Sequence, residues 1–351
     1  MSSVASIVAP TKSSLEETVL VTGATGFIGA HIVDNLLSRG LTVRGATRSL
    51  AKGQAMIDAR PQYASRLSFV QIADFQSPGG LNEAVMGVDA IVHSASPLTY
   101  DTTDNEQELV IPAINGVRAV FEAAAACVSV RRIVITSSFA SVLDAARKGP
   151  PYFTYTGQDW NPLTYEETID KNTSAVIAYR GAKKFAELEA WNFVKDKKPG
   201  FSLVALCPPM TFGPVVHPVD AAENLNESNA MLWKIAKGES PLPVARVPFW
   251  IDVRDLAAAH VEALLREEVA MKRYTPSAPE RFTYGLAASL VNEEFPGLKG
   301  TVAVEAQQAD ESYGLDGETA ARELGFTYRT FREAVQDLIT QALDMKDTRK
   351  E

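Results

Sequence analysis

Short apolar runs alternate with longer amphipathic stretches through the first part of this chain. The strand-like runs lie at 19–22, 41–47, 67–72, 89–93, 132–136 and 201–206. The helical patterns between them lie at 27–39, 105–129 and 179–197. Runs that are apolar throughout are typical of strands covered on both faces, and their alternation with helices indicates right-handed βαβ crossovers. The pattern therefore predicts an α/β fold with a doubly wound, mostly parallel sheet.

The alternation ends at Cys207, and a proline-rich segment follows. Helical patterns resume near 225–237, 253–267, 281–294 and 329–344. This change of rhythm predicts a smaller, helix-rich C-terminal domain that binds the substrate. Its expected extent is 208–343, with segments near 244–260 returning to the first domain, which comprises 17–207. The polar ends, 1–16 and 344–351, are expected to be flexible tails.

Composition limits the partners that this chain can have. A hydrophobic content of 46% and a charged content of 22% are ordinary for a globular protein, and the net charge of −9 argues against nucleic acid as a partner. No apolar run approaches the roughly 20 residues that a membrane span needs, and the N-terminus lacks the features of a signal peptide. Two cysteines form no disulfide framework, which favours a reducing compartment, so we expect a cytoplasmic protein.

A glycine-rich turn connects the first strand-like run to the first helical pattern. Gly23 allows the tight turn, Gly26 lets the backbone approach a pyrophosphate, and Gly29 lets the helix pack close to the strand. The start of the helix then offers free N–H groups and a partial positive charge to the anion. In this strand–turn–helix context, the glycines predict a Rossmann-type dinucleotide site.

The residues after the second strand distinguish between the two nicotinamide cofactors. An acidic residue there would bind a ribose hydroxyl, but this chain has Arg48 at that point and Lys52 a helical turn later, with no acid between Arg44 and Lys52. A guanidinium can bind a phosphate through two hydrogen bonds, and the lysine adds a second charge. We therefore predict NADPH or NADP+ as cofactor, although two solvated surface cations would give the same pattern.

The candidate catalytic groups are Ser138, Tyr179 and Lys183. Tyr179 and Lys183 are four residues apart on one face of an expected helix, where the positive charge would favour the phenolate and lower the pKa of the tyrosine. Ser138 follows the fifth strand, at the edge of the sheet where the nicotinamide should lie. A core tyrosine, a solvated lysine and a capping serine are the alternatives for each residue taken alone.

Several motifs occur in an order that resembles the extended short-chain dehydrogenases/reductases. Within that family, the chain is similar to the dihydroflavonol-reductase-like branch. Within that branch, it most resembles the fungal NADPH-dependent aldehyde and ketone reductases of methylglyoxal type. They run from Val21 to about Phe326. The matching segments are Thr22–Gly29, Arg48–Lys52, His93–Pro97, Pro112–Gly116, Thr136–Ser138, Tyr179–Lys183, Phe212–Pro214 and Ile251–Asp255.

The resemblance implies a complete set of site residues. Ser138 would position the substrate carbonyl, Tyr179 would donate a proton to it, and Lys183 would tune Tyr179 and bind the nicotinamide ribose. Residues implied to bind the cofactor are Gly23, Thr25, Gly26, Phe27, Ile28, Gly29, Arg48, Lys52, Asp74, Phe75, Ala95, Ser96, Ser137, Tyr179, Lys183 and Pro208. No metal ligands are expected. In some relatives the helices at 105–129 and 179–197 form a homodimer bundle, which is therefore a possible assembly here.

The function expected from these residues is NADPH-dependent reduction of an aldehyde or ketone to an alcohol. The candidate apolar pocket wall is Leu98, Leu143, Val176, Met210 and Trp250, for each of which ordinary core packing is the alternative. A nucleotide-sugar epimerase or dehydratase shares the fold and the tyrosine–lysine pair, but such enzymes usually retain NAD, which Arg48 does not favour. A non-catalytic NADP-sensing regulator typically lacks the tyrosine that is present here as Tyr179.

Overall fold

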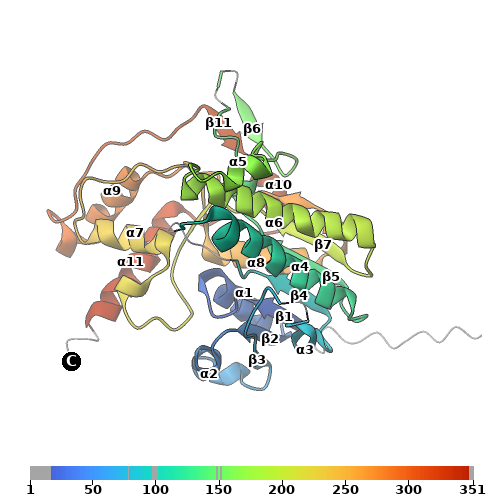
Figure 1. The fold of residues 1–351 in the computed structure, drawn as a ribbon. Helices are drawn as coiled ribbons and strands as arrows, with labels where there is room; N and C mark the ends of the chain where they lie inside the picture. The colour runs from blue at the N-terminus through green and yellow to red at the C-terminus, as the bar shows by residue number, and fades with distance from the viewer. Residues whose placement is uncertain (1–16, 78, 97–101, 148, 151, 348–351) are drawn as a thin grey trace, which may run out of the picture.

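The computed structural model describes residues 17–77, 79–96, 102–147, 149–150 and 152–347. Its central sheet has seven parallel strands in the order β10-β7-β5-β4-β1-β2-β3 (Figure 1). These strands are β1 Thr18–Thr22, β2 Thr42–Thr47, β3 Leu67–Gln71, β4 Ala90–His93, β5 Arg132–Thr136, β7 Ser202–Leu206 and β10 Arg273–Tyr274. The Rossmann-type parallel sheet is confirmed, and six of its strands coincide with the predicted runs.

Helices cover the sheet on both faces, as the apolar strands require. On one face lie α1 (Phe27–Ser38) and α8 (Val253–Leu265), which pack against Val19 and Val21 of β1. On the other face lie η3 (Glu106–Val110), α4 (Ile111–Ala125) and α6 (Ala175–Lys197), which pack against Leu20. Successive side chains of a strand point to opposite faces, so one short apolar run supplies both cores.

Shorter elements connect the strands of the sheet. They are α2 Leu50–Asp58, η2 Pro61–Tyr63, α3 Asn82–Val85, η4 Phe139–Ser141 and α5 Tyr165–Ile169. The N-terminus of α2 is capped by the Ser49 hydroxyl, which accepts a hydrogen bond from the Lys52 amide at 3.4 Å. Asp, Asn, Ser and Thr are favoured at this position because their side chains satisfy an amide that the helix leaves unpaired. The cap fixes where α2 begins and so places Lys52 in its first turn.

The C-terminal part forms a second body beside the sheet, here called the cap. Its helices α7 (Glu227–Ala236), α9 (Tyr284–Glu294) and α11 (Phe331–Asp347) pack around a core that contains Phe212, Phe282 and Phe331 (Figure 1). Strands β8 Met210–Phe212 and β9 Trp250–Asp252 form a small parallel pair beside this core. A second parallel pair, β6 Phe153–Tyr155 with β11 Tyr313–Leu315, packs instead with Phe139, Val142 and Leu143. The remaining short helices are η5 Ala222–Asn224, η6 Glu267–Val269 and η7 Pro296–Leu298.

Several segments that follow Cys207 in sequence belong to the sheet layers rather than to the cap. Helix α8 contributes Ala257 and Val261 to the core beside α1, and α10 (Glu318–Leu324) contributes Ala320 to the same core. Strand β10 extends the sheet at the edge of β7. The chain therefore crosses between the two bodies more than once after residue 207.

Candidate active site

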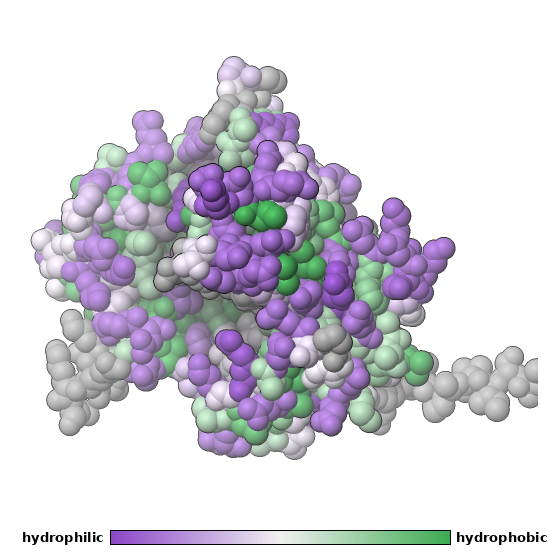
Figure 2. Space-filling view, in the orientation of Figure 1, coloured by the Kyte–Doolittle hydropathy of each residue, from purple (hydrophilic) through white to green (hydrophobic). Residues whose placement is uncertain are grey.

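A cavity of 1010 Å³ lies where the carboxyl ends of the strands face the cap. Its walls come from the turns after β1, β2, β3, β4 and β5, from α6, and from the cap. Figure 2 shows this face of the molecule hollowed near its centre, with hydrophobic side chains visible inside the hollow. In open α/β sheets the ligand binds outside the carboxyl ends of the strands, so the cavity has the expected position for a cofactor and a substrate.

The glycine-rich turn forms one end of the cavity. Gly23 has φ +71, a backbone conformation that residues with a side chain rarely adopt, and a Cβ there would lie only 2.9 Å from the Ala95 backbone nitrogen. Both the backbone conformation and the lack of space therefore require glycine. A Cβ on Gly29 would lie 2.1 Å from the Gly23 carbonyl oxygen. Gly26 is the N-cap of α1 and gives it no side-chain cap, and no acidic residue follows in the first turn. The first amides of α1 thus remain available to an anion, which fits a pyrophosphate.

Two cations border the cavity beyond the glycine-rich turn. Arg48 and Lys52 are exposed, and both line the cavity. Asp74 and Phe75 line it after β3, and the Asp74 carboxylate accepts hydrogen bonds from the Gln76 amide and the Ser77 hydroxyl. These bonds lower the pKa of Asp74. Cationic side chains at this end fit the additional phosphate of NADPH, so the described residues are compatible with the predicted cofactor.

The wall between the two ends of the cavity is fixed by a buried histidine. The Thr22 hydroxyl lies 2.8 Å from His93 Nδ1 and accepts a hydrogen bond from the Ala95 amide. Burial, together with the nearby Lys183 charge, lowers the pKa of His93 to about 4. His93 is therefore neutral at neutral pH, and its hydrogen bond with Thr22 positions the turn that carries Ala95.

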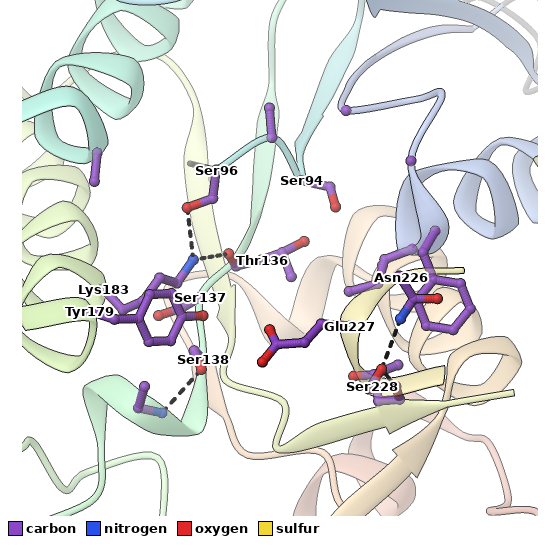
Figure 3. A pocket seen from close by; sticks show the side chains of 18 of the residues that line it. Ser94, Ser96, Thr136, Ser137, Ser138, Tyr179, Lys183, Asn226, Glu227 and Ser228 are labelled. Carbon is purple, nitrogen blue, oxygen red and sulfur yellow. Dashed lines mark hydrogen bonds between the residues drawn. The ribbon is translucent and has the colours of Figure 1, made fainter. Parts of the chain in front are cut away.

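Lys183 projects from α6 to the middle of the cavity wall. Its ammonium group donates hydrogen bonds to the Thr136 carbonyl at 3.2 Å and to Ser96 Oγ at 3.4 Å (Figure 3). Burial lowers the pKa of Lys183 to about 8, and the Glu187 charge opposes that effect. At neutral pH the group therefore remains mostly protonated in a nearly dry environment, where its charge acts strongly on its neighbours.

Tyr179 and Ser138 lie on the same side of the cavity as Lys183. Tyr179 is one helical turn before Lys183 on α6, and Figure 3 shows the phenol beside the lysine and above Ser138. The Ser138 hydroxyl caps η4 by accepting a hydrogen bond from the Ala140 amide at 3.1 Å. That bond leaves the Ser138 proton free to be donated to a ligand oxygen. The structure thus brings the three predicted catalytic groups together at one point of the cavity.

A buried ion pair supports this wall from behind. Glu187, one turn after Lys183 on α6, accepts hydrogen bonds from Ser137 at 2.5 Å and Ser141 at 2.8 Å. Arg273 of β10 donates to the same carboxylate at 2.6 Å, and both side chains are almost completely buried. The guanidinium also stacks on the Trp160 ring at 3.8 Å. This network holds the turn that carries Ser138 against α6, and the sequence interpretation did not identify it.

Most residues assigned to the site from the sequence line the cavity. Two of the described residues, Pro208 and Trp250, do not line it, and one residue lies outside the description. Leu98 lies outside the described residues. Pro208 is not among the lining residues, whereas Pro209 is, because neighbouring residues of this extended segment face opposite sides and the Pro208 carbonyl accepts a hydrogen bond from the Phe139 amide. Trp250 is fully buried against Phe331 in the cap core, so its expected place in the pocket wall is wrong.

The cap contributes polar groups that the sequence interpretation missed. Asn226, Glu227 and Ser228 line the cavity at the start of α7, and Arg246 and Tyr284 line it nearby. Burial and the Glu227 charge raise the pKa of Tyr284 to about 12, and the Arg246 charge opposes that shift. The substrate side of the cavity is therefore not purely apolar, although Leu143, Val176 and Met210 line it as expected.

Within the part of the chain that the structure describes, no group of three or more His, Cys, Asp or Glu side chains is placed to hold a metal ion. The helices described for this chain include none that is both long enough and apolar enough to cross a membrane.

Comparison with known proteins places the chain in a family. The model of the NAD dependent epimerase/dehydratase family matches residues 19–274. The chain belongs to this family. The resemblance to the extended short-chain dehydrogenases/reductases is thereby confirmed.

Fungal reductases are among its relatives. The NADPH-dependent methylglyoxal reductase of Saccharomyces cerevisiae is 33% identical, with 93% of this chain and 98% of that protein covered. A ketoreductase of Aspergillus niger is 32% identical, with 94% and 99% covered. This chain superposes on the crystal structure of the yeast methylglyoxal/isovaleraldehyde reductase complexed with NADPH with a TM-score of 0.86. The two sequences are 32% identical, and the match covers 94% of this chain and 99% of that one.

Proposed function

We propose that this protein is an NADPH-dependent carbonyl reductase that converts aldehydes or ketones to alcohols. The observation that carries the proposal is the convergence of Ser138, Tyr179 and Lys183 on a cavity whose other end has a glycine-lined anion site and two exposed cations. The relatives named as NADPH-dependent or as ketoreductases support the same activity and cofactor.

The three side chains have distinct roles in this reaction. Ser138 donates its free proton as a hydrogen bond to the carbonyl oxygen of the substrate and so fixes that oxygen beside the phenol of Tyr179. Tyr179 gives its proton to this oxygen as the carbonyl carbon is reduced. The Lys183 ammonium, held by Thr136 and Ser96, stabilises the phenolate that remains and would also bind the ribose of the cofactor.

The cofactor site follows from the opposite end of the cavity. The amides at the start of α1 would bind the pyrophosphate, and Arg48 with Lys52 would bind the additional phosphate. Ala95, Ser96 and the remaining lining residues of the turns after β3 and β4 would border the adenine and ribose groups. NADPH, when bound, supplies the hydride.

We also infer that the protein acts in the cytoplasm on a small-molecule substrate. The reducing conditions of that compartment agree with Cys127 and Cys207, which are free cysteines in the structure. Leu143, Val176 and Met210 support a substrate with an apolar body. Homodimer formation through α4 and α6 stays a prediction.

Removal of the Tyr179 hydroxyl tests the proposal. The purified protein should oxidise NADPH when it is given aliphatic or aryl aldehydes, and Tyr179→Phe should lower kcat at least about a hundred-fold, because a positioned proton donor contributes about 10²–10⁴. NADPH binding, measured by the quenching of protein fluorescence, should remain close to that of the wild type. Turnover of the variant at the wild-type rate would show that the proton comes from another group.

A further inference from the structure

One carboxylate in the cavity has no use in the proposed chemistry. Glu227 is the first residue of α7 and lines the cavity from the cap. Figure 3 shows its carboxylate extending across the cavity toward Ser138 and Tyr179, from the side opposite to α6. The two other acidic lining residues are already explained, since Glu187 pairs with Arg273 and Asp74 lies at the cofactor end.

The surroundings of Glu227 leave this carboxylate available to a ligand. Its neighbour Glu223 forms an ion pair with Lys237 at 3.5 Å, whereas no ion pair or hydrogen bond of the Glu227 carboxylate occurs within the described residues. An acidic residue in the first turn of a helix stabilises the helix dipole. That role accounts for an acid at this position, but it does not account for a side chain that reaches toward the reacting groups.

Asn226 adds a second hydrogen-bond acceptor without a partner. The Ser228 hydroxyl donates to the Thr211 carbonyl at 2.6 Å and must therefore accept the bond at 2.8 Å from the Asn226 amide nitrogen. The amide oxygen of Asn226 then points elsewhere, and it is buried with no partner among the described atoms. Because this oxygen is inaccessible, the acceptor that the start of α7 offers to a ligand in the cavity is the Glu227 carboxylate.

The positive groups of the cavity do not cancel this preference. Arg180 and Arg246 line the cavity, but each already takes part in an interaction of its own. The rest of the cap-side wall mixes apolar side chains, such as Met231 and Phe282, with the phenol of Tyr284. A cationic donor on the substrate would meet the exposed Glu227 carboxylate at this wall and form a charge-assisted hydrogen bond with it.

We propose that Glu227 determines substrate specificity. It selects aldehydes and ketones that carry a hydrogen-bond donor, above all a protonated amine, at the end of the molecule remote from the carbonyl group. It disfavours substrates that carry a carboxylate at that end. This inference rests on the proposed reductase function, because it assumes that the carbonyl group binds at Ser138 and Tyr179.

Three aldehydes of similar shape test the proposal. They are para-(dimethylaminomethyl)benzaldehyde, which is cationic, para-isobutylbenzaldehyde, which is its neutral isostere, and para-carboxybenzaldehyde, which is anionic. We expect the wild type to prefer the cationic to the neutral aldehyde about ten-fold in kcat/KM, which corresponds to about 1.4 kcal/mol. Glu227→Gln should bring this ratio close to one. Glu223→Gln, which changes an acid of the same segment outside the cavity, should leave the ratio unchanged.

The outcomes separate this inference from the function on which it rests. Reduction of the neutral aldehyde by the wild type reports the reductase activity alone, and failure with every aldehyde would overturn both proposals. A wild-type ratio near one, or a preference that survives in Glu227→Gln, overturns only the role of Glu227. Glu227→Lys provides a second variant and should shift the preference toward the anionic aldehyde. Thermal melting and NADPH titration establish that each variant is folded.

Discussion

We predict that the choice between NADPH and NADH depends on Arg48, which lines the cofactor end of the cavity. Arg48→Asp removes a phosphate-binding guanidinium and places a carboxylate at the same point of the cavity. Because a charge-assisted hydrogen bond contributes about 1.5–3 kcal/mol, we expect the Kd for NADPH to rise roughly ten- to hundred-fold. NADH, which lacks the additional phosphate, should bind almost as before or slightly better. Fluorescence titration with both cofactors measures the difference.

A charge-matched control distinguishes a local effect from a general one. Lys197→Asp changes the net charge by the same amount at the exposed end of α6, away from the cavity. It should leave both dissociation constants nearly unchanged, since exposed charges beyond a Debye length are screened. Equal weakening of NADPH and NADH by Arg48→Asp would remove Arg48 from the phosphate site.

Single residues also mark where sequence reasoning fails at this site. The glycines, Arg48, Ser138, Tyr179 and Lys183 stand next to recognisable turns and helix faces, so their position at the cavity could be predicted from local pattern. Glu227 follows a proline-rich segment with no periodicity that could indicate which way it points. Its place opposite Tyr179 depends on how the cap folds onto the sheet, which no local pattern encodes.

At the scale of elements, the contact between α6 and β10 depends on a buried ion pair. Glu187→Gln leaves the Arg273 guanidinium buried with its charge no longer balanced. Removing one partner of a buried pair costs about 3–5 kcal/mol, and we expect a loss of this size in the free energy of unfolding, measured with urea. The variant should also lower kcat, because Gln has one acceptor oxygen in place of two and cannot keep all the hydrogen bonds that fix the Ser138 turn.

The same helix supplies a matched control. Glu189 pairs with Arg118 of α4 at 2.7 Å on a part of the surface where the arginine is half exposed. Glu189→Gln should therefore cost less than about 1 kcal/mol, as is usual for exposed ion pairs. If the two variants were equally stable, burial of the Glu187 pair would have no energetic consequence and its supporting role would have to be abandoned.

The elements that could be predicted are those with a long, regular pattern. Helices such as α1 and α6 and six strands of the sheet are recognisable, because each buries a periodic or continuous apolar face. The pairs β6–β11 and β8–β9 have three residues in each strand, too few for any periodicity. Their partners are also distant in sequence, so only the assembled fold brings them together. Trp250 shows the same limit, since an isolated aromatic residue does not reveal which core it enters.

At the scale of the whole molecule, the active site is a boundary between two bodies. The sheet layers carry the proposed anion site and the candidate catalytic groups, whereas α7 and the segment before β9 line the opposite side of the cavity. Elements α8, β10 and α10 return to the sheet layers, so the cap is tied to them at several points. The division of the chain into domains 17–207 and 208–343, with segments near 244–260 returning to the first domain, stays a prediction.

Acid should destabilise the molecule through its histidines. Burial lowers the pKa of His93, His217 and His260 to about 4 each. In the unfolded chain a histidine has a pKa of about 6.5. Below that value the unfolded state binds protons that the folded state does not, so stability is complete above about pH 6.5 and is lost progressively as the pH falls toward 4.

His260 allows this dependence to be measured at one site. Its ring bonds the Thr136 hydroxyl at 2.7 Å and the Leu256 carbonyl at 2.8 Å, which joins α8 to the end of β5. One such group changes the free energy of unfolding by about 1.4 kcal/mol per pH unit in this window. The glutamine of His260→Gln cannot titrate. Between about pH 7 and pH 5, the free energy of unfolding of this variant should therefore fall less steeply than that of the wild type. The difference in slope should correspond to the uptake of up to about one proton on unfolding. Parallel slopes for the two proteins would mean that His260 gains its proton in the folded state as readily as in the unfolded one.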